Sequence, residues 1–171
     1  MTNKNTIDFY KYWTTEAVKS DLDKKRNNFS VLISNESYDF NIGTVIRNSN
    51  AFLAKDVYIF GRKKWDRRGA VGTHHYQNLH HVKFVEDVDF AKFCVVGVDN
   101  VEGASPLEEF TWDSDKPYLM IFGQENEGIP QKLVDKCDRL LYIKQYGSVR
   151  SLNVGCASSI AMYDYCRKVV K

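Results

Sequence analysis

The chain has 171 residues, of which 43% are hydrophobic and 27% are charged, and its net charge is +2. These values indicate a folded protein with a core of ordinary size and exclude a disordered or low-complexity chain. No run of about 18 apolar residues occurs, so we expect no membrane span. The first residues also lack the apolar block of a signal peptide. We therefore expect a single domain over residues 1–171 and a cytoplasmic location.

The predicted helices and strands alternate along the chain. An amphipathic helix is predicted over residues 8–26, which contain no Pro or Gly and place apolar residues at helical spacing. Further helices are predicted over 44–54, 129–137 and 151–170. Short apolar runs predict buried strands at 29–34, 57–61, 82–86, 93–98, 118–123 and 139–144. This order predicts an α/β fold with a mostly parallel sheet and helices on both faces.

Three polar clusters each follow a predicted strand. They contain Asn41 and Arg47; Gln124, Glu125 and Glu127; and Arg150, Ser151 and Asn153. Ligands of parallel α/β sheets bind beyond the carboxyl ends of the strands, so the clusters together predict a site. Each cluster also has a purely structural explanation. Asn41 and Ser151 could be helix N-caps, Arg47 could be a solvated side chain, and the acidic residues could favour the start of the next helix.

The segment from Gly61 to His81, here called the basic connector, concentrates positive charge. It carries five basic residues against one acidic residue, a charge of +4 that leaves −2 for the rest of the chain. Basic side chains attract phosphate, and the interleaved Trp65 and Tyr76 could stack unpaired bases. A solvated loop is the alternative. The basic residues concerned are Arg62, Lys63, Lys64, Arg67 and Arg68.

Metal and disulfide chemistry is not expected. All four histidines lie in the basic connector, but no nearby Cys or well-spaced carboxylate completes a tetrahedral set. They are His74, His75, His80 and His81. The four cysteines form no C-x-x-C pair and lie in apolar or helical runs, which predicts buried, reduced thiols. They are Cys94, Cys137, Cys156 and Cys166.

Three motifs in the same order resemble those of the SpoU (TrmH-like) family of RNA 2′-O-ribose methyltransferases, part of the SPOUT superfamily. "NIGTVIRNSNAF" matches the first motif, "FGQENEGIP" the second and "SVRSLNVGCASSIAMYDY" the third. The motif positions are Asn41 and Arg47; Gly123, Glu125 and Gly128; and Ser151 and Asn153. The chain departs from the family where Asn48 and Ser49 replace a common Thr-Ala pair. It also departs where "IKQYG" replaces an Ile-Pro-Met type of strand end.

The resemblance implies methyl transfer from S-adenosylmethionine to a ribose 2′-hydroxyl of RNA, with transfer RNA expected before ribosomal RNA. It implies a C-terminal trefoil knot, a homodimer and an active site near the interface. Arg47 is the implied catalytic residue, positioned together with Asn41, Glu125, Ser151 and Asn153. Cofactor contacts are expected, largely through the main chain, from Val98, Gly123, Ile143 and Leu152. RNA recognition is then expected from this domain, its N-terminal helix and the basic connector.

Two other functions remain open from the sequence. One is a non-catalytic RNA-binding module that retains the fold. The other is a flavodoxin-like nucleotide-binding domain without an RNA partner. Binding of S-adenosylmethionine separates the first from an enzyme, and salt-dependent RNA affinity separates the second.

Overall fold

The computed structural model describes residues 6–36, 40–125 and 127–170. Its strands form one parallel sheet in the order β3-β2-β1-β6-β4-β7-β5, in which every neighbouring pair is parallel. The predicted α/β fold with a mostly parallel sheet is therefore confirmed. The strands are β1 (Phe29–Asn35), β2 (Val57–Gly61), β3 (Leu79–Val82), β4 (Cys94–Val98), β5 (Ser105–Pro106), β6 (Tyr118–Phe122) and β7 (Arg139–Tyr142).

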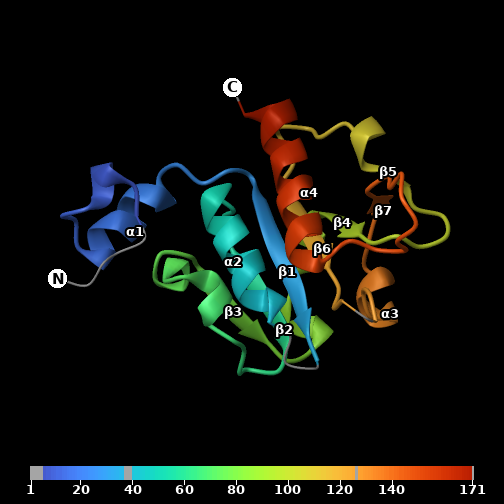
Figure 1. Ribbon diagram of the computed structural model, residues 1–171, viewed down its shortest axis with the longest axis horizontal. Coiled ribbons are helices and arrows are strands. Elements are labelled where there is room, and N and C mark those ends of the chain that lie inside the picture. Colours follow the sequence, from blue (N-terminus) through green and yellow to red (C-terminus); the bar gives the residue numbers. More distant parts are fainter. Residues whose placement is uncertain (1–5, 37–39, 126, 171) are drawn as a thin grey trace.

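The α-helices cover the two faces of the sheet unequally. Helices α2 (Asn41–Ala51) and α4 (Val154–Val169) lie side by side on one face, as Figure 1 shows. There Ile42 and Tyr165 belong to the same buried cluster as Val31 of β1. The short α3 (Gln131–Val134) covers the other face, where Leu133 packs with Leu32. Alternate residues of β1 thus face opposite cores, as expected for a strand that is buried on both sides.

The N-terminal helix is shorter than the sequence predicts. Residues 8–26 contain a 3-10 turn (Asp8–Tyr10) and a separate helix α1 (Thr15–Asp23). Thr14 between them is extended, with φ −69° and ψ 160°, and its hydroxyl accepts a hydrogen bond from the N–H of Ala17. An N-cap with this conformation starts a new helix, so it interrupts the continuous helix that the apolar spacing suggested.

The strand predicted over residues 82–86 is also displaced. Strand β3 ends at Val82, and the chain then forms a 3-10 turn (Val85–Asp87). The carboxylate of Asp87 accepts hydrogen bonds from the N–H groups of Lys83 and Phe84, at 3.0 and 2.8 Å. These bonds close a turn where the apolar alternation had suggested continued strand. The two-residue strand β5 was not predicted because it is too short to show a pattern.

In the part of the chain that the structure describes, no helix combines the length and the apolarity that a bilayer crossing requires. All four cysteines are free, but they are not uniformly buried as predicted. Cys156 is exposed in the first turn of α4, whereas Cys94, Cys137 and Cys166 are half-buried. Burial raises the pKa of the Cys137 thiol to about 12.

Candidate functional site

A chain of hydrogen bonds joins the three motifs. At the start of α4, the N–H groups of Gly155 and Cys156 donate to Asn153 Oδ1 at 2.9 and 3.3 Å. Asn153 Nδ2 donates to Asn41 Oδ1 at 2.9 Å, and Asn41 Nδ2 donates to Glu125 Oε2 at 3.0 Å. The polar clusters that lie far apart in the sequence therefore meet, as predicted from their positions after the strands.

The start of helix α4 determines which group donates and which accepts in each of these hydrogen bonds. Because Asn153 Oδ1 caps the free N–H groups of α4, the other end of its amide must be a donor. The same argument orients Asn41, which is 6% exposed, and leaves Glu125 as the acceptor at the end of the chain. The N-cap of α4 is thus Asn153 rather than Ser151. The alternative explanation of Asn41 as a helix N-cap does not hold either, since Asn41 lies inside α2 and the cap position is Phe40.

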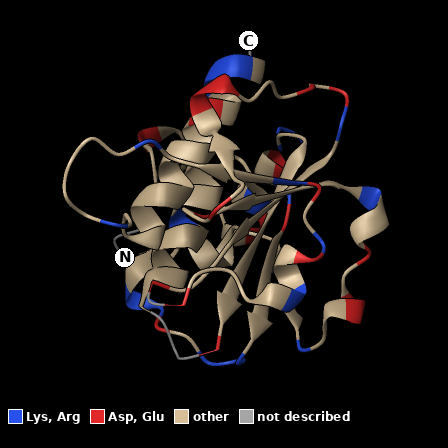
Figure 2. Cartoon of the chain, turned by 90° about the vertical axis from the view of Figure 1, so that its right-hand side faces the viewer, with Lys and Arg blue, Asp and Glu red and all other residues tan. Residues whose placement is uncertain are grey.

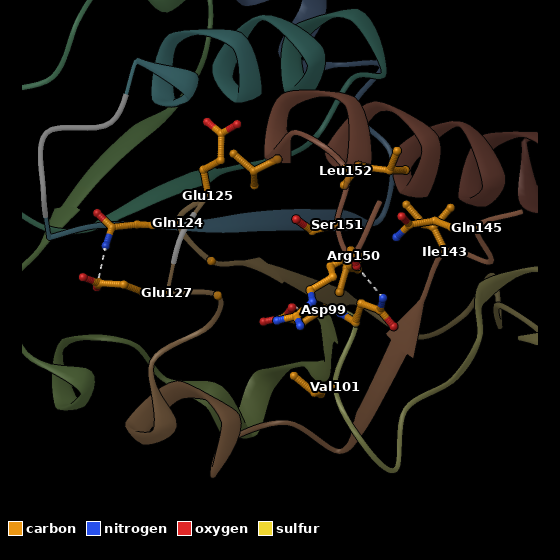
Figure 3. Close-up of a pocket in the computed structure, with 16 residues that line it drawn as sticks. Asp99, Val101, Gln124, Glu125, Glu127, Ile143, Gln145, Arg150, Ser151 and Leu152 are labelled. Carbon is orange, nitrogen blue, oxygen red and sulfur yellow. Dashed lines mark hydrogen bonds between the residues drawn. The ribbon is translucent and has the colours of Figure 1, made fainter. Parts of the chain in front are cut away.

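A pocket of about 350 Å³ opens at the carboxyl ends of β4, β6 and β7 (Figure 3). The predicted cofactor-binding residues, Val98, Gly123, Ile143 and Leu152, all line it. Glu125 and Ser151 line it as well, so the hydrogen-bonded chain ends on its wall. The structure therefore brings the predicted cofactor-binding residues into one cavity, which has the position expected for a ligand in a parallel sheet.

Close main-chain packing forms one wall of this pocket. The N–H groups of Gln124 and Gly128 each donate to the carbonyl of the other, at 3.1 and 3.0 Å, which folds the second motif into a tight loop. A Cβ at Gly123 would overlap the main chain of Gly128, and Gly128 itself has φ +66°. Both positions therefore require glycine, for close approach in one case and for a left-handed conformation in the other.

Three further polar residues line the pocket outside the motifs: Asp99, Asn100 and Gln145. Asp99 accepts hydrogen bonds from the N–H groups of Ile129 and Asn100, both at 2.8 Å, and thereby links the end of β4 to the segment that follows the second-motif loop. Asn100 Nδ2 donates to the carbonyl of Arg150 at 2.7 Å and links the loop after β4 to the third motif. Sequence reasoning missed these residues, although each follows a predicted strand and the rule on carboxyl ends could have found them.

Arg47 lies on the exposed side of α2 and is not among the residues that line this pocket. It follows Asn41 by six residues, a rise of about 9 Å along a helix. No described residue forms a hydrogen bond or an ion pair with its guanidinium. The neighbouring Asn48 Nδ2 donates to Gly155 O at 2.7 Å and to Ser158 Oγ at 3.0 Å. These bonds hold α2 against α4 beside Arg47.

The basic connector begins at the end of β2 and packs against the first turn of α2. Asn35 Nδ2 donates to the carbonyls of Arg62 and Lys64 at 2.8 and 3.0 Å, which holds the start of the connector. Gly69 packs closely against Thr44 of α2. All five of its basic side chains, Arg62, Lys63, Lys64, Arg67 and Arg68, are exposed. On the side of the molecule that Figure 2 presents, by contrast, basic and acidic residues are interspersed.

The four histidines divide between two places. The rings of His74 and His75 lie 4.1 Å apart, whereas His80 Nε2 pairs with Asp56 Oδ1 at 2.7 Å. Burial, and then the nearby His75 and Arg67, lower the pKa of His74. Among the described residues, no group of three or more His, Cys, Asp or Glu side chains has an arrangement that could hold a metal ion.

Comparison with known proteins gives one family. The model of the SpoU rRNA Methylase family matches residues 28–163. The Bacillus subtilis protein YacO, which is named as a TrmH family tRNA/rRNA methyltransferase, is 26% identical over 170 residues, 93% of this chain and 67% of that protein. A TrmH family protein of Staphylococcus haemolyticus is 25% identical over 88% of this chain and 63% of its own length. The chain thus spans about two thirds of the length of these relatives.

Solved structures show the same fold. The TrmH/SpoU tRNA modifying enzyme of A. aeolicus aligns over 90% of this chain and 81% of its own, with a TM-score of 0.76 and 22% identity. The SpoU methyltransferase AviRb of Streptomyces viridochromogenes, in complex with the cofactor AdoMet, aligns over 83% of this chain and 58% of its own. Its TM-score is 0.72 and its identity 25%. With the three motifs joined at one pocket and the family match over most of its length, the chain belongs to the SpoU rRNA methylase family.

Proposed function

We propose that this protein transfers the methyl group of S-adenosylmethionine to a ribose 2′-hydroxyl of RNA. The observation that carries the proposal is the chain of hydrogen bonds from Asn153 through Asn41 to Glu125, which joins the three family motifs at the wall of one pocket. A non-catalytic RNA-binding module would not need to keep this arrangement beside a cavity of cofactor size.

The pocket fits S-adenosylmethionine by its construction. Its volume of about 350 Å³ lies within the range of small-molecule sites. Close packing of Gly123 on Gly128 leaves main-chain atoms at the wall, where a nucleoside can be held without large side chains. Val98, Gly123, Ile143 and Leu152 would hold the cofactor. AviRb, a family member of similar fold, has been solved with AdoMet bound.

Each site residue has a role that follows from its chemistry. S-adenosylmethionine supplies, when bound, a methyl group on a positively charged sulfur. A ribose hydroxyl is a poor nucleophile at neutral pH, so the protein must orient it and stabilise its developing negative charge. The guanidinium of Arg47 is a planar cation with several N–H donors, which suits this electrostatic role and the clamping of a phosphate. Asn41 and Asn153 hold the Glu125 carboxylate at the wall, and Ser151, which also lines the pocket, would help to position the ribose.

A homodimer belongs to the same proposal. Arg47 is exposed and does not line the pocket of its own chain, which supports a site completed by a second copy. Helix α4 also exposes Ile160 and Tyr163, at 40% and 57%, as an apolar face suited to a partner. The knot is proposed on related grounds. Strand β7 lies between β4 and β5, and Asn100 ties the loop that joins β4 and β5 to Arg150.

Transfer RNA is our proposed substrate class, and the five basic side chains of the connector are its proposed contacts. The connector packs on the first turn of α2 through Gly69 and Ala70, and the charge of its basic side chains complements a phosphate backbone. The A. aeolicus neighbour, of which 81% is covered, is described as a tRNA modifying enzyme. The cytoplasm is the proposed location, where RNA and the cofactor are available and where four free cysteines stay reduced.

The test is transfer of a labelled methyl group from S-adenosylmethionine to separated transfer and ribosomal RNA. Nuclease digestion of the product then locates the label on ribose or base. Label on a ribose of transfer RNA is the expected result. Label on a base would refute ribose specificity, and label on ribosomal RNA alone would replace the substrate class. Binding of RNA without binding of S-adenosylmethionine would favour the non-catalytic module instead.

A further inference from the structure

An aromatic side chain is exposed at the start of α2, directly before the first motif. Phe40 occupies the N-cap position of this helix and is 52% exposed. The aromatic residues of the basic connector offer no such surface, because Tyr76 is buried and Trp65 is half-buried. Single exposed apolar residues are common and need no explanation. Phe40 differs in its place, because the next residue is Asn41, which joins the three motifs.

A basic side chain of the connector lies over this ring. The guanidinium carbon of Arg68 is 5.6 Å from the ring centre of Phe40. Its Nε and Nη2 donate to Asp66 Oδ2 at 3.0 and 2.6 Å, which fixes the guanidinium. The side chain of Arg68 is nevertheless 82% exposed. An aromatic ring and a planar cation therefore lie together at the surface.

Main-chain packing holds this pair at the helix start. A Cβ at Gly43 of α2 would lie 2.8 Å from the carbonyl oxygen of Asp66, so only glycine lets the connector approach the helix this closely. Arg68 follows Asp66 by two residues, and its backbone N–H donates to Asp66 Oδ1 at 2.9 Å. These contacts place Arg68 beside the first turn of α2, where it meets Phe40.

The pair also lies near the wall where the reaction is proposed. Asn41 Nδ2 donates to Glu125 Oε2 at 3.0 Å, and Glu125 lines the pocket and points toward α2 (Figure 3). The Cα atoms of Phe40 and Asn41, as consecutive residues, are about 3.8 Å apart. A nucleotide whose ribose reaches this wall therefore has the ring of Phe40 among its nearest exposed surfaces.

We propose that the base of an unpaired nucleotide at the reaction site stacks on Phe40 and on the guanidinium of Arg68. Unpaired RNA bases stack on aromatic rings and on guanidinium planes, and the charge of the connector draws phosphates to the same place. Phe40 is then a positioning residue that selects nucleotides outside a double helix, where bases already stack on one another. The inference rests on the proposed function, because it names the form of RNA that the same site accepts.

The experiment measures binding of two labelled oligoribonucleotides to the full chain by fluorescence anisotropy. One is a dodecamer of uridine, and the other is the same ribose-phosphate chain without bases. Both carry the same charge, so the ratio of their affinities reports on the bases. For the wild-type chain we expect the uridine dodecamer to bind about tenfold more tightly, the size of one stacked base.

Three variants test whether Phe40 is the surface responsible. Phe40→Leu should bind both oligomers about equally, because it keeps an apolar side chain and loses the flat ring. Phe40→Tyr keeps the ring and should retain the preference. Phe84→Leu is the matched control and should also retain it. Phe84 is 57% exposed and has Lys83 Nζ 5.1 Å from its ring centre, but it is adjacent in sequence to no motif.

The outcomes separate the inference from the function beneath it. Equal affinity of the wild-type chain for both oligomers, or an unchanged preference in Phe40→Leu, would overturn the role of Phe40. Loss of the preference together with a smaller size in size-exclusion chromatography would assign Phe40 to a subunit interface and overturn it as well. A wild-type chain that binds uridine through Phe40 but transfers no methyl group to RNA would refute the proposed function and leave the stacking role standing. Thermal unfolding first establishes that each variant is folded.

Discussion

Replacing Asn41 by Ala should break the connection among the three motifs. The substitution removes the hydrogen bonds to Glu125 and Asn153 at 3.0 and 2.9 Å. A bond to a carboxylate contributes about 1.5–3 kcal/mol and a neutral one about 1 kcal/mol. Because Glu125 and Asn153 are exposed, water will satisfy much of what they lose. We therefore expect the free energy of unfolding to fall by about 2 kcal/mol.

Urea denaturation measures this change, and Asn50→Ala is the matched control. Asn50 lies on the same helix, but its buried Nδ2 has no partner in the described structure, so its loss should change stability by less than about 0.5 kcal/mol. Asn41→Asp keeps the size and the acceptor but sets a second carboxylate against Glu125, and should destabilise at least as much as Asn41→Ala. Equal midpoints for Asn41→Ala and Asn50→Ala would refute the argument that Asn41 holds the motifs together.

Three other predictions concern the pocket, the connector and the cysteines. Gly123→Ala should force the second-motif loop apart, because the new Cβ would overlap Gly128. We expect calorimetry to show that cofactor affinity falls at least about tenfold. Unchanged affinity would contradict the close packing. Replacing both Lys63 and Lys64 by Ala should reduce the slope of log affinity for RNA against log salt by about 1.5 while stability stays constant. At pH 8, iodoacetamide should modify the exposed Cys156 quickly and Cys137 hardly at all, because burial raises the pKa of Cys137 to about 12. Peptide mapping measures the two rates, and equal rates would contradict this prediction.

The sequence predicted the sheet well because burial on both faces leaves a strong apolar signal. Strands β1 and β6 are buried along their whole length, β6 is apolar throughout and β1 has an apolar centre, and their order with the helices made parallel pairing the natural arrangement. The boundaries were less predictable where one side chain decides them. The hydroxyl of Thr14 divides the N-terminal helix, and the carboxylate of Asp87 closes the turn after β3.

The site was predictable as a meeting of motifs but not in its details. Position after a strand brought Glu125 and Asn153 to the same edge, whereas local reasoning chose the wrong N-cap for α4. A Ser two residues before an Asn offers two possible caps, and only tertiary contact with Asn41 selects between them. The apolar spacing of its helix left Arg47 off the buried stripe, and its exposure is confirmed, but its position outside the pocket of its own chain was not predicted.

The central claim is that this pocket and Arg47 together carry out methyl transfer to RNA. Single-turnover transfer of labelled methyl to RNA by the wild-type chain and by Arg47→Ala, with cofactor affinity measured on the same samples, tests it most directly. We predict that turnover is abolished in Arg47→Ala while cofactor affinity and stability remain, because no described residue depends on that guanidinium. Transfer at the wild-type rate by Arg47→Ala would contradict the account.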